Sequence, residues 1–176
     1  KGKKAYNHYQ DAVKFFQANR AHISDFYAYR QFLFISQDLL YNSQYSVAKK
    51  LTREATDLFD GEEKEELLFT HLWADIIPEN YDEAEESIEE LGLNTANQHM
   101  GHKLKYWIGR IYLNTGKTSK AKEIYRALIE ETPLNYYSIL ATKDLAKLTP
   151  EKVDVDQLIS DATTKHVGLI DLNDND

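Results

Sequence analysis

The sequence predicts an all-α protein in which helical hairpins repeat and stack into a curved solenoid. The 176 residues include only 7 Gly and 3 Pro, whereas an all-β chain needs many tight turns. Apolar residues recur with helical spacing, and no alternating strand pattern of useful length appears. A short pattern that ends in alanine returns every 36 or 37 residues, at Ala12, Ala48, Ala84 and Ala121.

Each alanine lies near the start of a helix. The apolar residues four and seven positions later, such as Tyr125 and Leu128 after Ala121, fall on the same helical face. The alanine is small because we expect another helix to cross close to it. A second amphipathic stretch precedes each of the last three copies, over residues 25–42, 63–77 and 102–114. The unit is therefore a hairpin, and stacked hairpins bury a continuous core and form a concave face.

Helix boundaries carry their own signals. Gly61, Gly92 and Gly116 are each predicted to lie just past a helix, and Pro78 to close the run before it. Thr132 and Pro133 are predicted to cap and open a helix over residues 134–148. We expect one helical-repeat domain of about four hairpins over residues 1–150. A short acidic helix and tail would occupy residues 151–176. The start without Met and the abrupt acidic end suggest a piece of a longer protein.

Composition and charge exclude several classes of protein and of functional site. The absence of Cys excludes disulfide scaffolds, thiolate zinc sites and cysteine nucleophiles. Lys and Arg number 21 against 29 Asp and Glu, and the acidic residues gather between Glu54 and Glu90. We interpret this block as a solvated helix face. Nucleic acid is not an expected partner, because phosphates need a basic surface. No run of 18 apolar residues exists, so no membrane span is predicted.

The best-formed unit, residues 102–135, resembles a tetratricopeptide repeat. We expect Gly109 and Ala121 to face each other at the helix crossing, with aromatic rings beside them. In the other units, Ser36 and Leu72 take the place of Gly109. Six residues of this unit match the small, aromatic and helix-breaking positions of that repeat: Gly109, Tyr112, Gly116, Ala121, Tyr125 and Pro133.

A narrower resemblance covers about 45 residues. Tyr106-Trp107 with Arg110 is followed by the repeat helix and then by Tyr136-Tyr137-Ser138 with Ala141. This order is similar to the helical superhelix of the soluble lytic murein transglycosylases, where a glycine occupies the position of Ser138.

That resemblance implies a periplasmic scaffold that acts in peptidoglycan turnover and positions the glycan strand or the catalytic domain. In the family, a lysozyme-like domain cleaves between N-acetylmuramic acid and N-acetylglucosamine. Its signature, a Glu-Ser pair followed by a Gly-Leu-Met-Gln segment, is absent from this sequence. The resemblance therefore assigns no catalytic residue here, although the parent protein is a candidate transglycosylase. The alternative is a tetratricopeptide adaptor, of cytoplasmic location, that binds a protein or peptide.

The first helices of the hairpins supply the candidate binding groove. Lys103, Tyr106, Arg110 and Leu113 lie three to four residues apart and would present two cations and a tyrosine. In the preceding hairpin, the equivalent aromatic residues are Phe69 and Trp73. Such a groove suits glycan strands or peptides. The competing interpretation is that several of these side chains pack against the next hairpin.

No catalytic, metal or cofactor site is predicted. The glutamates from Glu62 to Glu66 open a helix, where negative charge favours the positive end of the helix dipole. His99 and His102 are three residues apart, but no Cys or carboxylate pattern completes a metal site around them.

Overall fold

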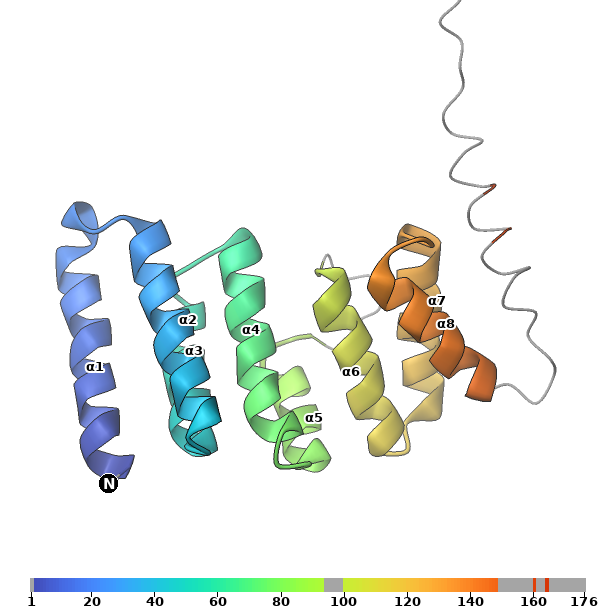
Figure 1. The fold of residues 1–176 in the computed structure, drawn as a ribbon, viewed down its shortest axis with the longest axis horizontal. Coiled ribbons are helices and arrows are strands. Elements are labelled where there is room, and N and C mark those ends of the chain that lie inside the picture. Colours follow the sequence, from blue (N-terminus) through green and yellow to red (C-terminus); the bar gives the residue numbers. More distant parts are fainter. Residues whose placement is uncertain (1, 94–99, 149–159, 161–163, 165–176) are drawn as a thin grey trace, which may run out of the picture. The chain divides into compact units, whose positions relative to one another are not determined.

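The computed structural model describes residues 2–93, 100–148, 160 and 164, and within this part every regular element is helical (Figure 1). The described part contains no strand, which confirms the prediction of an all-α chain. The side chain of Ala12 and the predicted acidic helix and tail, apart from residues 160 and 164, lie outside the described residues.

The helices follow one another with short connections. A single turn of 3-10 helix, Arg20–His22, separates the first two. The helices from α2 onwards correspond closely to the stretches predicted from the sequence, whereas α1 begins at Gly2, ten residues before Ala12, and not near this alanine as predicted. Their bounds are α1 Gly2–Asn19, α2 Asp25–Tyr41, α3 Tyr45–Thr56, α4 Gly61–Ile76, α5 Tyr81–Glu90, α6 His102–Asn114, α7 Thr118–Glu131 and α8 Tyr136–Leu148.

The chain divides into two compact units, residues 1–88 and residues 89–176. The first unit holds α1 to most of α5, and the second holds α6, α7 and α8. The single domain over residues 1–150 stays a prediction.

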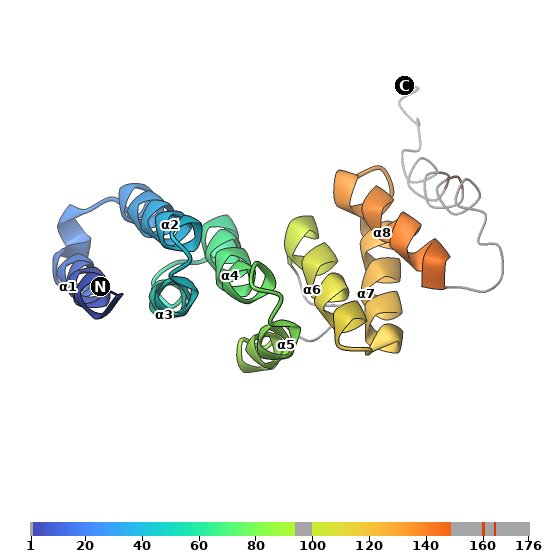
Figure 2. The ribbon, with the colours of Figure 1, turned by 60° about the horizontal axis from the view of Figure 1, so that its bottom comes forward.

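In the first unit, α3 packs against both α2 and α4, and α2 and α4 also contact each other. Figure 2 shows α2 and α4 side by side, with α3 and α5 on the same side of them. Ala48 and Ala84, the alanines that mark the repeat, are completely buried. Around Ala48, the core includes Phe16, Phe32, Leu39, Leu51, Ala55, Phe59 and Leu67.

In the second unit, α7 packs against α6 and α8, and α6 also contacts α8. Gly109 of α6 lies against the ring of Tyr125 on α7: the three atoms nearest to a Cβ built on this glycine all belong to Tyr125. The sequence predicted Ala121 at this place. Ala121 is fully buried, but the tyrosine one turn further along α7 fills the space that the glycine leaves.

Three helices end in the same backbone motif. After α2, α4 and α6, the residues in the left-handed conformation are Ser43, Glu79 and Gly116, with φ of 57°, 62° and 77°. In each case the next N–H bonds the carbonyl five residues back, at 2.8 to 2.9 Å. This is the Schellman arrangement, which satisfies the last carbonyls of a helix. The three positions each precede a repeat alanine by five residues, so the hairpin turn repeats with the alanines.

Two further predicted helix boundaries need correction. Gly61 has a positive φ of 59°, but it is the first residue of α4 and lies well beyond the end of α3 at Thr56. The last predicted helix begins at Tyr136. Asn135 accepts a hydrogen bond from the N–H of Tyr137 through its side-chain oxygen at 2.9 Å, so Asn135 caps α8 in place of Thr132. Gly92 follows α5 with φ of 67°, as predicted.

Candidate functional site

An aromatic cleft lies between α2 and α4 and contains two of the predicted groove residues. Phe69 and Trp73 are one turn apart on α4, and their rings stack with centroids 5.3 Å apart and an interplanar angle of 27°. The cleft has a volume of about 480 Å³, which is within the range of ligand sites. Its walls are Gln37, Leu40, Tyr41, Ser43, Tyr45, Glu66, Phe69, Thr70, Trp73 and Ile77.

Aromatic rings alternate with hydroxyl and amide groups around this cleft. Tyr41 at the end of α2 is 88% exposed, and the Tyr45 hydroxyl lies 3.4 Å from Ser43 Oγ. Glu66 is the one charged residue among the lining residues. Apolar ring faces beside hydrogen-bonding groups suit a ligand that is itself uncharged and amphipathic.

A polar pocket adjoins the cleft, because Ser43 and Tyr45 line both. It lies between the turn that joins α2 to α3 and the end of α4, with a volume of about 350 Å³. Its walls are Ser43, Gln44, Tyr45, Ser46, Lys49, Ala74, Asp75 and Asn80.

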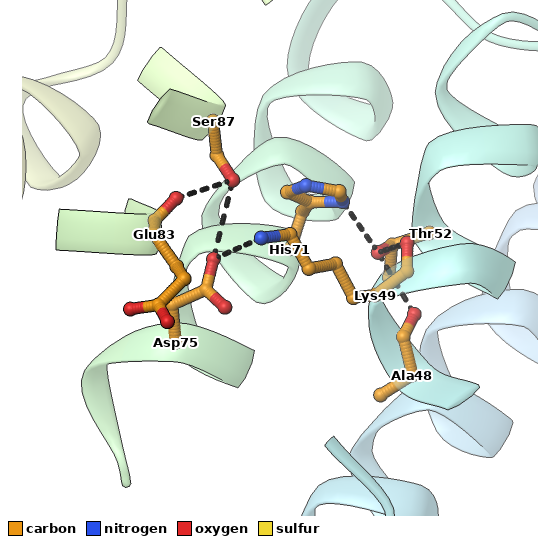
Figure 3. Close-up of polar contacts among 7 residues, drawn as sticks. All are labelled: Ala48, Lys49, Thr52, His71, Asp75, Glu83 and Ser87. Atoms are coloured by element: carbon orange, nitrogen blue, oxygen red, sulfur yellow. Dashed lines mark hydrogen bonds and ion pairs between the residues drawn. The ribbon is translucent and has the colours of Figure 1, made fainter. Parts of the chain in front are cut away.

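An ion pair joins α3 to α4 at the wall of the polar pocket (Figure 3). Lys49 Nζ lies 2.7 Å from Asp75 Oδ2, and the Asp75 side chain is only 8% exposed. Ser87 of α5 donates its hydroxyl to the same carboxylate oxygen at 3.2 Å. The carboxylate is therefore held from two neighbouring helices.

A buried histidine lies one turn away on α4. His71 Nδ1 is 3.1 Å from Thr52 Oγ1, and that hydroxyl is also 2.9 Å from the carbonyl oxygen of Ala48 (Figure 3). Burial lowers the pKa of His71 to about 4, and the positive charges of Lys49 and Arg53 act in the same direction. His71 is thus neutral at pH 7 and links α3 to α4 as a hydrogen-bonding group.

This network is not predicted from the sequence. Thr52 lies four positions after Ala48 and is buried. Polar residues such as Thr52 and Ser87 on an otherwise apolar face were the available signal, because buried polar groups need partners. The partner residues on α4 could not be named without knowing how the helices are paired.

The second unit contains the other predicted groove residues, and among them Tyr106 is buried. It is 5% exposed, stacks on Tyr125 with centroids 5.9 Å apart, and donates its hydroxyl to Asp144 Oδ2 at 3.1 Å. Burial raises the pKa of this hydroxyl. Leu113 packs against the same cluster. Tyr106 thus contacts both α7 and α8, and Leu113 packs against the cluster that these helices share.

Arg110 and Lys103 are more accessible than Tyr106. Arg110 is bound inside the unit, because its Nη1 lies 3.6 Å from Asp144 Oδ2 and donates to the Tyr106 hydroxyl at 3.4 Å. Lys103 is half-buried. These residues belong to the second unit and Phe69 and Trp73 to the first, so the single groove predicted from both sets stays a prediction.

Most of the predicted repeat residues of the second unit are buried, whereas Gly116 is exposed in its turn. Tyr112, Ala121 and Tyr125 are fully buried, and Pro133 is buried as well. The Tyr112 and Tyr125 hydroxyls have no hydrogen-bond partner among the described residues. Lys120 Nζ lies 5.0 Å from the centroid of the Tyr112 ring and covers it.

The described residues give no indication of a metal site or of a membrane-spanning helix. The described residues contain no cluster of three His, Cys, Asp or Glu side chains that would hold a metal ion. Of the predicted histidine pair, His99 lies outside the described residues. In the part of the chain that the structure describes, no helix combines the length and the apolar character needed to cross a bilayer.

Comparison of the chain with protein-family models, curated proteins and solved structures finds no match in any of the three.

Proposed function

We propose that the chain is the non-catalytic, tetratricopeptide-like solenoid of a soluble lytic transglycosylase-like protein. In this role it binds a glycan strand of peptidoglycan in the periplasm and positions it for cleavage elsewhere. The observation that carries the proposal is the aromatic cleft between α2 and α4, with Phe69 stacked on Trp73. The family resemblance of residues 106–141 supplies the cell-wall context.

The chemistry of the cleft favours a sugar. A sugar ring has an apolar face of C–H groups that packs on aromatic rings, and hydroxyls at its edge that need hydrogen bonds. Tyr41 and Trp73 offer rings, while Gln37, Ser43 and Thr70 offer polar groups around them. With Glu66 the one charge in the lining, the cleft has no pair of cations that would select a phosphate or an acidic peptide.

The regular spacing of the hairpin turns supports the solenoid. Left-handed residues at 43, 79 and 116 recur with the same spacing as Ala48, Ala84 and Ala121. A turn and a small buried residue that repeat together are what stacked hairpins require.

Retention on purified sacculi tests the proposal. The wild-type chain is expected to sediment with sacculi, and Trp73→Ala is expected to reduce the bound fraction at least several-fold. Trp107→Ala is the matched control, because Trp107 is a partly buried residue of the second unit that packs against its core cluster and does not line the cleft. Equal retention of wild type and Trp73→Ala contradicts a role for the cleft. Release of muropeptides by the chain alone contradicts the non-catalytic assignment.

A protein-binding adaptor is the second candidate, and a different surface favours it. An apolar groove of about 580 Å³ lies between α1 and α2, and Phe15 and Tyr27 on its walls are 63% and 67% exposed. Exposed aromatic residues beside a groove are typical of protein-binding surfaces. Phe15→Ser with Tyr27→Ser separates the candidates, because this double variant would keep sacculus binding if the cleft between α2 and α4 is the glycan site.

A further inference from the structure

The polar pocket beside the cleft lies where a substituent of a bound sugar would reach. Ser43 and Tyr45 separate the two hollows and line both of them. A ring that packs in the cleft would therefore direct a group on its edge towards Gln44 and Lys49. What that group is follows from the charges and hydrogen-bonding atoms of the pocket, given the proposed function.

The charges of the pocket balance. Lys49 and Asp75 are the two charged residues in its lining, and they pair at 2.7 Å. An incoming carboxylate or phosphate would compete with Asp75 for Lys49, and an ammonium group would compete with Lys49 for Asp75. The pocket therefore suits an uncharged group.

The hydrogen-bonding atoms call for a group that both donates and accepts. Gln44 Oε1 is buried and has no hydrogen-bond partner among the described residues, so it lacks a donor. The Lys49 ammonium carries three N–H donors, of which its ion pair with Asp75 uses one. A secondary amide has one N–H and one carbonyl oxygen, which fit Gln44 and Lys49 respectively.

We propose that this pocket binds the N-acetyl group of a sugar whose ring lies in the aromatic cleft. The amide N–H is donated to Gln44 Oε1, and the acetyl oxygen accepts from Lys49 Nζ. The ion pair with Asp75 and the hydroxyl of Ser87 hold Lys49 and its partner in place from α4 and α5. The proposal rests on the proposed glycan function and adds the chemical feature that the cleft selects.

Two oligosaccharides with the same β-1,4 backbone test it. The hexamer of N-acetylglucosamine carries an acetamido group at C2 of each ring, where the glucose hexamer carries a hydroxyl, and the two are otherwise identical. Titration calorimetry with the wild-type chain is expected to give about tenfold tighter binding of the N-acetylated hexamer, the gain of one or two well-made hydrogen bonds.

Variants of two glutamines test whether the polar pocket causes the preference for the N-acetylated hexamer. Gln44→Met removes the acceptor at nearly constant size and is expected to reduce the preference to less than about twofold. Gln37→Met is the matched control, since Gln37 lines the cleft but not the polar pocket, and it is expected to keep the preference. In wild type, the side-chain amide resonances of Gln44 are expected to shift on addition of the N-acetylated hexamer, a readout that does not depend on a variant folding.

The outcomes distinguish failure of the N-acetyl site from failure of the proposed glycan function. Equal binding of the two hexamers by wild type overturns the N-acetyl site while the glycan cleft stands. Loss of the preference in Gln37→Met but not in Gln44→Met also overturns it. Binding of neither hexamer contradicts the glycan function itself, and binding of an N-acetylated peptide in their place assigns the pocket to a peptide ligand.

Discussion

Gly109 of α6 lies directly against the ring of Tyr125 on α7, and a Cβ at this glycine would approach Cδ1 and Cζ of that ring to 2.8 and 2.9 Å. Tyr125 is completely buried and also stacks on Tyr106. The ring therefore has no room to move away. We predict that Gly109→Ala lowers the free energy of unfolding by about 1–2 kcal/mol, because overpacking outweighs the better helix propensity of alanine.

Urea denaturation of a double-mutant cycle checks this prediction. Tyr125→Leu removes the ring, so Gly109→Ala in that background is expected to be neutral or stabilising. The same destabilisation in both backgrounds would show that the contact with Tyr125 is not the cause.

Glu79 is a non-glycine residue in the left-handed conformation after α4, at the position that Gly116 occupies after α6. A side chain at this φ is strained, and glycine is the residue usually found there. We predict that Glu79→Gly raises the free energy of unfolding by about 0.5–1 kcal/mol. Glu79→Ala serves as control, because it removes the charge but keeps the Cβ. An equal gain from both variants would attribute the effect to charge instead of backbone conformation.

His71 gives the first unit a defined dependence on pH. Its folded pKa of about 4 lies below the value of 6.5 for an exposed histidine. Between these values the unfolded chain binds a proton that the folded chain does not, so stability falls as the pH decreases from 6.5 to 4. The loss approaches about 3 kcal/mol. Above pH 6.5, His71 is neutral in both states and makes no such contribution.

The measurement compares the stability of wild type and His71→Gln from pH 7 to pH 4. The glutamine keeps a hydrogen-bonding side chain but does not titrate in this window, so the difference between the two proteins is expected to change with pH as described. Parallel curves over the whole range would show that His71 does not keep its low pKa in solution.

Lys105 is buried at 1% exposure, and its ammonium pairs with Glu131 at 2.5 Å. Removal of the carboxylate leaves a buried cation without this partner. We predict that Glu131→Ala lowers the free energy of unfolding by about 1–2 kcal/mol, which is less than for a fully buried pair because Glu131 is 46% exposed. Lys105→Met, which also removes the cation, is expected to cost less, and thermal unfolding of the two variants compares them. A larger loss from Lys105→Met would mean that the ion pair itself contributes the stability.

Much of the fold was predictable because helical hairpins are local. The periodicity of residues 102–114 and the alanine at 121 are sufficient to predict α6 and α7, and both helices are present. Helix ends were harder, since their determinants are single hydrogen bonds: Asn135 caps α8 through its side chain, although Thr132 and Pro133 carry the more familiar signal. The left-handed position after α2 is Ser43 and not a glycine, so the sequence gives no signal for this turn.

The candidate site was predictable only in part. Helical spacing predicts that Phe69 and Trp73 share one face of a helix, and both residues line the cleft. The same helical spacing predicts Tyr106 in the groove, but Tyr106 is buried. Its side chain contacts Tyr125 and Asp144, which belong to two other helices. Gln44 and Lys49 carry no motif, and their position beside the cleft follows from packing that the sequence does not display.

Fluorescence of Trp73 tests the central claim, that the cleft between α2 and α4 binds a glycan. The chain has 2 Trp, so Trp107→Phe leaves Trp73 as the single indole. Titration of this variant with the N-acetylglucosamine hexamer is expected to give a saturable change in emission. The change should disappear when Tyr41 and Phe69 are both replaced by alanine. A signal that stays constant up to millimolar hexamer, in a variant shown to be folded by circular dichroism, would contradict the claim.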